Sequence, residues 1–258
     1  MISQNNIYFK NNDFSLYKGD SFVLLEEIEN KTIDMIFADP PYFLSGDGIT
    51  CHSGMMVSVK KAEWDEEIDV SEKIEYNRRW IRLCRNLLTE EGTIWISGTF
   101  HNIYTIGVAL EFEGFTIINN IIWKKLNPPP NISCRAFTHS TETVLWAKKN
   151  NSKHYFNYEL MKKINRNKQM KDVWEFSLTK PSEKKEGKHP TQKPLDLLQR
   201  VILASTEEGD LVLDPFNGSG TTGIACAMLN RKYIGIDNIE KYLEISKKRY
   251  LSFIKIND

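Results

Sequence analysis

The stretch LVLDPFNGSGTTG, residues 211–223, decides the fold. An apolar run ends at Asp214, three glycines with the spacing GxGxxG follow, and an acid, Asp237, ends the next apolar run. A strand, a glycine loop, a helix and a second strand ending in an acid form the nucleotide-binding unit of a doubly wound sheet. This stretch therefore predicts a Rossmann-like α/β fold whose mostly parallel sheet binds a ligand at the carboxyl ends of its strands.

The rest of the chain alternates between strand-like and helix-like runs. IDMIFA, residues 33–38, is a continuous apolar run typical of a strand buried on both faces, and Asp39-Pro-Pro-Tyr42 stops it because proline cannot continue a central ladder. Gly92 is expected to mark the end of a helix whose apolar residues recur at helical spacing. We predict helices at 71–88, 102–112, 194–205, from the glycine loop to 229, and at 240–253, and strands at 93–97, 115–123, 141–147, 211–214 and 232–237.

Length and composition indicate one domain over residues 1–258. The chain has 258 residues, 41% of them hydrophobic, which is enough for a sizeable core and excludes disordered, collagen-like and disulfide-stapled classes. The amino terminus lacks a signal segment, and no apolar run approaches the ~20 residues that cross a bilayer, so we expect a soluble, cytoplasmic protein without membrane contact. The cysteines lack the spacings of zinc sites, so no metal is expected.

Charge is unevenly distributed along the chain. The 34 Lys and Arg balance the 34 Asp and Glu, yet residues 148–193 carry 13 basic and 5 acidic residues, a local balance of 13 − 5 = +8. Such segregation suits a polyanion bound at one face, although a solvated lysine-rich face is an equally ordinary explanation. Because residues 148–188 are also polar and weakly periodic, we interpret them as a basic region inserted into the α/β domain.

The residue before the glycine loop separates two classes of cofactor. A dinucleotide such as NAD carries a pyrophosphate that binds helix-terminal N–H groups and gains nothing from a nearby carboxylate. S-adenosylmethionine has no phosphate but carries an ammonium group, which Asp214 can accept in a charge-assisted hydrogen bond. The loop therefore favours S-adenosylmethionine, with the ribose hydroxyls on Asp237.

The turn Asp39-Pro40-Pro41-Tyr42 offers hydrogen-bond acceptors to an amine. An exocyclic amine of a nucleobase is a poor nucleophile because its lone pair is delocalised into the ring. The Asp39 carboxylate and the Pro40 carbonyl can each accept one N–H, which turns the lone pair toward a methylsulfonium carbon. Proline supplies a fixed φ and no N–H donor, and Tyr42 can stack on the flat face of an extruded base. We predict that these four residues are catalytic.

Together the motifs resemble those of the DNA amino-methyltransferases. DPPY comes first, the basic segment second and DPFNGSGTT last, with HPTQKP at 189–194 just before the glycine loop. This order is similar to that of the β-class adenine-N6 methyltransferases of restriction-modification systems. The resemblance runs over nearly the whole chain, including GTIWISG and NPPPNISCRAFTHSTET, and comes closest to the DpnA-type second methyltransferase of systems that recognise GATC.

The resemblance implies a site-specific enzyme that methylates adenine in GATC with S-adenosylmethionine and protects host DNA from a partner endonuclease. It also implies a circularly permuted methyltransferase sheet, since the acceptor half precedes the donor half, and an inserted target-recognition region. Asp20 would meet the adenine of the donor, and Gln192 and Lys193 would lie near its carboxylate. The donor-binding residues implied by the motifs are Asp20, Gln192, Lys193, Asp214, Phe216, Gly218, Gly220, Thr221, Thr222 and Asp237.

The resemblance places target recognition between the NPPPN segment and HPTQKP. Arg166, Lys168 and Gln169 are candidates for reading base edges, because Arg and Gln pair with guanine and adenine in the major groove. Most lysines there are expected to contact phosphates, which position DNA without specifying its sequence. The further residues that we expect to contact a base or a phosphate are Lys60, Lys124, Asn127, Asn131 and Arg135.

Several alternatives stay open at the level of the sequence. An RNA or protein-amide methyltransferase can use a similar turn, and a cytosine-N4 enzyme can as well, although those enzymes more often carry Ser where Asp39 stands. A nucleotide-binding oxidoreductase and a non-catalytic DNA-binding protein are rivals of other classes. The expected partner is duplex DNA, with single strands left open; no stable protein partner is implied, and the chain is a monomer or a homodimer.

Overall fold

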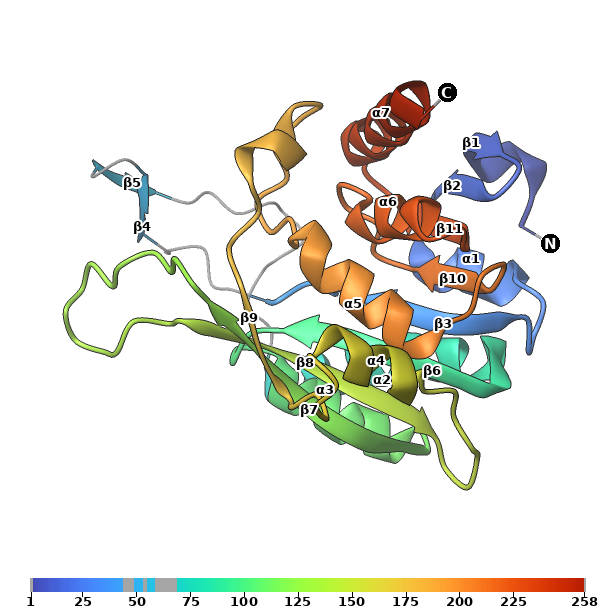
Figure 1. Cartoon of the computed structure of the whole chain (residues 1–258), viewed down its shortest axis with the longest axis horizontal. Coiled ribbons are helices and arrows are strands. Elements are labelled where there is room, and N and C mark those ends of the chain that lie inside the picture. The colour runs from blue at the N-terminus through green and yellow to red at the C-terminus, as the bar shows by residue number, and fades with distance from the viewer. Residues whose placement is uncertain (1, 44–48, 53–54, 59–68, 258) are drawn as a thin grey trace.

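Nine strands form one twisted sheet that runs through the centre of the molecule (Figure 1). The computed structural model describes residues 2–43, 49–52, 55–58 and 69–257. The strands are β1 (Ile7–Asn11), β2 (Phe14–Lys18), β3 (Ile33–Ala38), β6 (Leu88–Gly98), β7 (Phe115–Lys125), β8 (Thr141–Lys149), β9 (Val173–Phe176), β10 (Leu211–Asp214) and β11 (Lys232–Asp237). A separate two-stranded hairpin consists of β4 (Ile49–His52) and β5 (Met55–Ser58).

The sheet is mostly parallel, in the order β1-β2-β11-β10-β3-β6-β8-β7-β9. The five strands from β2 to β6 in this order are mutually parallel. Strand β8 is antiparallel to both of its neighbours, β1 is antiparallel to β2, and β9 is parallel to β7. Because β3, early in the chain, pairs with β10, late in the chain, the predicted permuted order of the acceptor and donor halves is confirmed.

Helices cover both faces of the sheet (Figure 1). The face on which the N-terminal helices pack carries α1 (Ser21–Glu27), α2 (Val70–Leu87) and α3 (Ile103–Phe112). The opposite face carries α4 (Tyr158–Ile164), α5 (Leu195–Ser205), α6 (Thr221–Met228) and α7 (Glu240–Asn257). Two short 3₁₀ turns, Gln4–Asn6 and Pro181–Lys184, complete the described helical elements. None of the described helices is both long and apolar enough to cross a membrane.

Strand β3 shows why residues 35–38 are all apolar. Met35 and Phe37 belong to the core beneath α5 and α6, whereas Ile36 and Ala38 belong to the core beneath α2 and α3. Successive side chains of a strand point to opposite faces, so a strand covered on both sides needs apolar residues at every position. All four side chains are buried, with at most 2% of the surface exposed.

Parallel pairing brings the polar residues that follow several strands to one edge of the sheet. Asp39 follows β3, while Asp214 and Asp237 are the last residues of β10 and β11. In an open α/β sheet, ligands bind outside these carboxyl ends. The loop between β7 and β8, residues 126–140, also begins at a carboxyl end and extends beyond the sheet (Figure 1).

Most predicted elements agree with the structure to within a few residues, but Gly92 does not end a helix. Helix α2 passes directly into β6 at Leu88, and Gly92 lies inside that strand, next to a register shift against β3. A Cβ at Gly92 would lie 3.1 Å from the carbonyl oxygens of Ile33 and Asp34. Gly92 therefore permits a close backbone approach in the sheet, which a local pattern cannot distinguish from a helix end.

The basic region contributes to the main core of the molecule. Met161 on α4 and Trp174 on β9 are 2% and 5% exposed and pack in the same cluster as α5 and α6. Strand β9 extends the edge of the sheet beyond β7. The region between 148 and 188 is thus packed against the sheet, while its role in target recognition stays a prediction.

We predict that Trp95→Ala destabilises the protein by about 3–5 kcal/mol, the usual cost of removing a fully buried tryptophan. Trp95 is 1% exposed, stacks on Trp146 at 4.8 Å between ring centroids, and donates a 2.8 Å hydrogen bond from Nε1 to Ser205 Oγ. Urea unfolding followed by circular dichroism measures the loss. Tyr104→Ala, which removes a ring that is 74% exposed, is the control, and equal losses in the two variants contradict the prediction.

Candidate active site

A cavity of about 340 Å³ opens at the carboxyl ends of β3, β10 and β11. One wall is formed by the Asp39–Tyr42 turn, a second by the glycine loop, and a third by the start of α1 and the residues after β11. All four predicted catalytic residues line this cavity. So do the predicted donor-binding residues other than Gly220, namely Asp20, Gln192, Lys193, Asp214, Phe216, Gly218, Thr221, Thr222 and Asp237.

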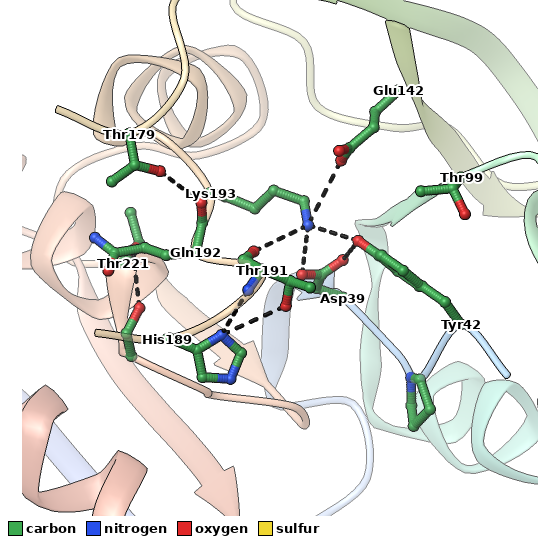
Figure 2. A network of polar contacts seen from close by, with 12 residues as sticks. Asp39, Tyr42, Thr99, Glu142, Thr179, His189, Thr191, Gln192, Lys193 and Thr221 are labelled. Atoms are coloured by element: carbon green, nitrogen blue, oxygen red, sulfur yellow. Dashed lines mark hydrogen bonds and ion pairs between the residues drawn. The ribbon is translucent and has the colours of Figure 1, made fainter. Parts of the chain in front are cut away.

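The Asp39 carboxylate makes two short hydrogen bonds (Figure 2). The Tyr42 hydroxyl donates to Oδ1 at 2.6 Å, and the Lys193 ammonium donates to Oδ2 at 2.6 Å. Lys193 Nζ also donates to the Tyr42 hydroxyl at 2.7 Å. Asp39, Tyr42 and Lys193 therefore form a closed triangle in which each member contacts the other two.

Burial dominates the electrostatics of this triangle. Loss of water raises the pKa of Asp39, and the Lys193 ammonium only partly offsets this. For Lys193 burial lowers the pKa, but the carboxylates of Asp39 and Glu142 outweigh it, so the pKa ends above the ordinary value. The lysine thus stays charged and compensates a carboxylate that would otherwise be alone in a low-dielectric wall.

Asn102 fixes the second half of the turn. Its side-chain Nδ2 donates to the Pro41 carbonyl at 3.2 Å, and Asn102 itself is 1% exposed at the start of α3. Proline has no N–H, so the turn offers few local donors to the Pro41 carbonyl. The Asn102 side chain supplies a donor from a neighbouring element instead. The sequence pattern did not single out Asn102, because nothing local links residue 102 to residue 41.

Asp214 lies at the base of the glycine loop with both carboxylate oxygens in use. Oδ1 accepts from the Phe216 N–H at 3.0 Å, and Oδ2 accepts from Thr222 Oγ1 at 2.6 Å. Burial nevertheless raises the pKa of Asp214 to about 7, because two donors only partly replace the water that a carboxylate loses. A positively charged group beside Asp214 would therefore stabilise its carboxylate.

Asp237 closes the other side of the loop. Its Oδ2 accepts from the Gly218 N–H at 2.8 Å and its Oδ1 from the Ile239 N–H at 2.8 Å. Burial raises the pKa of Asp237 to about 6. A carboxylate oxygen has room for more than one donor, so Asp237 can still accept hydroxyl groups.

Buried contacts hold the glycine loop in shape. Gly218 and Gly220 have φ values of +50° and +72°, and a Cβ at Gly220 would lie 1.9 Å from Ser246 Oγ. Arg249 on α7 donates from Nη1 to the Ser219 carbonyl at 2.7 Å. Only glycine suits these backbone angles and this close approach. Gly220 thus stabilises the shape of the loop without lining the cavity, at the position where α6 begins.

Aromatic side chains from three helices also line the cavity. Asp20 caps α1 by accepting from the Phe22 N–H at 2.7 Å, and the Phe22 ring meets Tyr76 edge-to-face at 5.2 Å. Tyr76 comes from α2 and Tyr242 from the start of α7, and both line the cavity. Neither tyrosine was predicted from the sequence. The one available signal for Tyr76 was its place on an amphipathic helix, which indicates packing and not a site.

The HPTQKP segment links the two halves of the cavity (Figure 2). The His189 ring lies under the glycine loop, 3.3 Å from where a Cβ of Gly218 would stand, and meets Tyr242 at 4.3 Å. The Gln192 carbonyl accepts from Thr179 Oγ1 at 2.5 Å. Its side-chain Oε1 is buried and finds no hydrogen-bond partner within the described part of the chain. Gln192 and Lys193 both line the cavity, and the Lys193 ammonium contacts Asp39 and Tyr42.

The residues present fit S-adenosylmethionine. The buried Asp214 carboxylate favours a cationic partner, and Asp237 can accept hydroxyl groups. Phe22 and Tyr76 offer aromatic surface to a purine. The unpaired Gln192 Oε1 is an acceptor for an ammonium group. A donor that carries an amino acid end, a ribose and an adenine therefore has a counterpart on each wall.

The predicted DNA-contacting residues of the NPPPN segment lie outside the cavity lining. Lys124 forms an exposed ion pair with Glu175 at 2.7 Å. Asn127 accepts from the Leu178 N–H at 2.9 Å, and Asn131 donates to the Ala136 carbonyl at 2.9 Å. Arg135 is exposed on the same loop. These contacts order the loop beside the active-site edge of the sheet.

The other predicted DNA contacts are placed differently. Arg166, Lys168 and Gln169 follow α4, and this segment leads into β9 at the lateral edge of the sheet. All three are exposed and none lines the cavity. Lys60 lies outside the residues that the structure describes. The roles of these residues in binding DNA stay predictions.

A protein family described as DNA methylase matches residues 33–248 of the chain. The chain belongs to this family. The match contains both the Asp39–Tyr42 turn and the glycine loop, and it confirms the predicted DNA methyltransferase, with S-adenosylmethionine as the methyl donor. Membership in the DNA methylase family excludes the nucleotide-binding oxidoreductase and the non-catalytic DNA-binding protein.

Curated relatives of this DNA methylase are similar over almost their full length. The chain is 60% identical over 244 residues to the Type II methyltransferase M2.LlaDCHI of Lactococcus lactis subsp. cremoris, covering 94% of this chain and 91% of that protein. It is 58% identical to M2.DpnII of Streptococcus pneumoniae, with the same coverage. These similarities confirm the predicted relationship to the DpnII-type second methyltransferases.

Solved structures support the same fold. A complex of M1.HpyAVI with its SAM ligand is 30% identical, with a TM-score of 0.69 over 92% of this chain and 98% of that chain. The cytosine-N4-specific PvuII DNA methyltransferase is 20% identical, with a TM-score of 0.75 over 93% of this chain and 87% of that chain, and this likeness concerns the fold alone. The predicted methyltransferase fold with a mostly parallel sheet is confirmed.

We predict that Asp214→Asn has opposite effects on stability and donor binding. The pKa of Asp214 is raised from 3.8 in the unfolded chain to about 7 in the folded protein, so the folded protein loses stability as the pH rises between these values. Asparagine removes that loss. The variant should gain about 2 kcal/mol more relative to wild type at pH 8 than at pH 5.5, because one pKa unit corresponds to ~1.4 kcal/mol.

The same variant should bind S-adenosylmethionine at least about tenfold more weakly, since a charge-assisted hydrogen bond is lost. Chemical unfolding at the two pH values and titration calorimetry measure the two effects. Asp13→Asn, at an exposed turn position, is the control for both. A variant with unchanged donor affinity would show that Asp214 does not contact the ammonium group.

Proposed function

We propose that this DNA methylase is a site-specific adenine-N6 methyltransferase that modifies GATC and protects host DNA from a partner endonuclease. The observation that carries the proposal is the Asp39 carboxylate in the wall of a cavity whose other walls hold Asp214 and Asp237. An amine acceptor site and a donor site thus share one space. The similarity to Type II methyltransferases supports the restriction-modification role, and the resemblance of the motifs to GATC enzymes supports the target sequence.

In the proposed reaction the turn after β3 binds and orients the target amine. Asp39 accepts one N–H of the amine and the Pro40 carbonyl accepts the other, which directs the nitrogen lone pair away from the turn. The Tyr42 hydroxyl, bonded to Asp39 Oδ1, keeps the carboxylate in place. Rigid prolines keep these acceptors in place before the amine arrives, so little reorganisation is needed in the transition state.

The donor half of the cavity holds the methyl donor against that turn. Asp214 and Gln192 Oε1 accept from the ammonium group, Asp237 accepts the ribose hydroxyls, and Phe22 and Tyr76 border the adenine. When bound, S-adenosylmethionine supplies an electrophilic methyl group on a sulfonium. Burial keeps water from Asp214 and Gln192 Oε1, which strengthens their polar contacts.

DNA is proposed to bind across the edge of the sheet from which the cavity opens. The loop between β7 and β8 and the basic region up to the HPTQKP segment carry the predicted contacts, with positive side chains on phosphates. Duplex DNA is the proposed substrate, and its target base has to leave the base stack to reach the Asp39–Tyr42 turn. A monomer or homodimer acting in the cytoplasm, where bacterial DNA lies, is sufficient for this reaction.

We predict that the protein transfers label from methyl-labelled S-adenosylmethionine to a duplex containing GATC. A duplex whose GATC adenines already carry N6-methyl groups should take up little label, since a methylated amine keeps only one N–H and cannot donate to both Asp39 and the Pro40 carbonyl. Nucleoside analysis of the product identifies the methylated base. Label recovered in cytosine or only in RNA would refute adenine methylation, and single-stranded GATC DNA tests whether a duplex is required.

We predict that Asp39→Asn lowers turnover about 100- to 1000-fold, the usual effect of removing one preorganised polar contact to the reacting group. Donor affinity should change by less than about threefold, because Asp39 lies on the acceptor wall. Single-turnover rates and calorimetry with S-adenosylmethionine measure the two quantities. Asp34→Asn is the matched control, because Asp34 belongs to the same strand but accepts from the Leu211 N–H at the far end. Full turnover in Asp39→Asn would disprove its role.

A further inference from the structure

The ammonium group of Lys193 contacts the carboxylate that is proposed to accept the target amine. It donates to Asp39 Oδ2 at 2.6 Å and to the Tyr42 hydroxyl at 2.7 Å (Figure 2). Asp39 Oδ1 already accepts from Tyr42 and Oδ2 from Lys193, so both oxygens have a donor before an amine arrives. In the protein without DNA, Lys193 therefore competes with the amine for the same acceptor.

A second carboxylate stands beside this ammonium group. Glu142, near the start of β8, places Oε2 at 3.7 Å from Lys193 Nζ, and its other oxygen forms an ion pair with Lys125 at 2.8 Å. Glu142 Oε2 is buried and has no hydrogen-bond partner among the residues that the structure describes. An unpartnered carboxylate oxygen in such a place is costly, and it lies just beyond hydrogen-bond distance of a donor.

The charges in this cluster keep Lys193 protonated in either position. Asp39 and Glu142 face Lys193 and Lys125, so two negative charges balance two positive ones. A buried ammonium must keep a carboxylate partner, and the lysine stem with its rotatable bonds lets Nζ pivot between two of them. A shift of about 1 Å toward Glu142 would bring Nζ to ordinary hydrogen-bond distance from Oε2.

We propose that Glu142 is a positioning residue that accepts the Lys193 ammonium when the target amine enters, and so frees Asp39 Oδ2 for that amine. This inference rests on the proposed role of Asp39. No covalent bond forms or breaks in the step, and no proton is transferred. The two buried carboxylates share one cation, which pairs with Asp39 in the resting protein and with Glu142 when substrate is bound.

The role predicts a defect that depends on the amine itself. Without the charge of Glu142, Lys193 has no second carboxylate to pair with and stays on Asp39. Binding of a duplex with adenine at the target position then weakens, whereas an abasic duplex, which brings no amine to Asp39, is unaffected. A purely structural role for Glu142 would weaken both complexes equally.

The test compares Glu142→Gln with wild type by fluorescence anisotropy on these two duplexes, with S-adenosylhomocysteine present to prevent reaction. We expect about tenfold weaker binding of the adenine duplex, as for the loss of a hydrogen bond to a charged group, and less than about twofold change for the abasic one. In a Lys193→Met background, Glu142→Gln should no longer change the ratio of the two affinities. Glu111→Gln, at an exposed position of α3, is the control.

Equal losses of affinity for the two duplexes, or no loss for either, overturn the inference. So does a change in the ratio of the two affinities when Glu142→Gln is made in the Lys193→Met background. If circular dichroism shows that Glu142→Gln is unfolded, Glu142→Asp keeps the charge on a shorter side chain and should show a smaller loss confined to the adenine duplex. An unchanged ratio in that variant overturns the inference as well. Wild-type transfer of label to adenine, measured on the same preparation, separates this result from a failure of the proposed function.

Discussion

The parallel pairing of β3 with β10 is the constraint on which the site depends. Val212 pairs with Met35 and Leu213 with Ile36, which joins two strands that lie more than 170 residues apart in the chain. Both strands end at the same edge, so Asp39 and Asp214 border one cavity. Covering helices on both faces hold this pairing in place, because the strand side chains are buried on either side.

The same arrangement concentrates buried acids. Burial raises the pKa values of Asp39, Asp214 and Asp237, although each accepts hydrogen bonds within the protein. The fold therefore keeps charges that lower its own stability at neutral pH, and binding of cationic and hydroxyl-bearing groups offsets that cost. This trade between stability and function is usual for sites whose polar groups are arranged before the ligand arrives.

The HPTQKP segment contacts both halves of the site. The HPTQKP segment follows the basic region and leads into α5, so it lies between the glycine loop and the turn after β3. His189 supports the glycine loop, while Lys193 compensates Asp39. The Lys193–Asp39 ion pair therefore occupies the acceptor wall, and in the proposed mechanism the target amine displaces it.

The sequence by itself determined the local elements and the two motif-bearing turns, because apolar periodicity, proline and glycine act over a few residues. The glycine loop, Asp237 and the Asp39–Tyr42 turn were recognisable on those grounds, as was the order of the two halves. Tertiary structure alone decided that Lys193 pairs with Asp39, that Glu142 lies beside Lys193, that Asn102 holds the Pro41 carbonyl, and that Tyr76 lines the cavity. The contacts of Lys193 with Glu142 and Asp39 and of Asn102 with Pro41 join residues 51 to 154 positions apart, and no local pattern encodes such pairings.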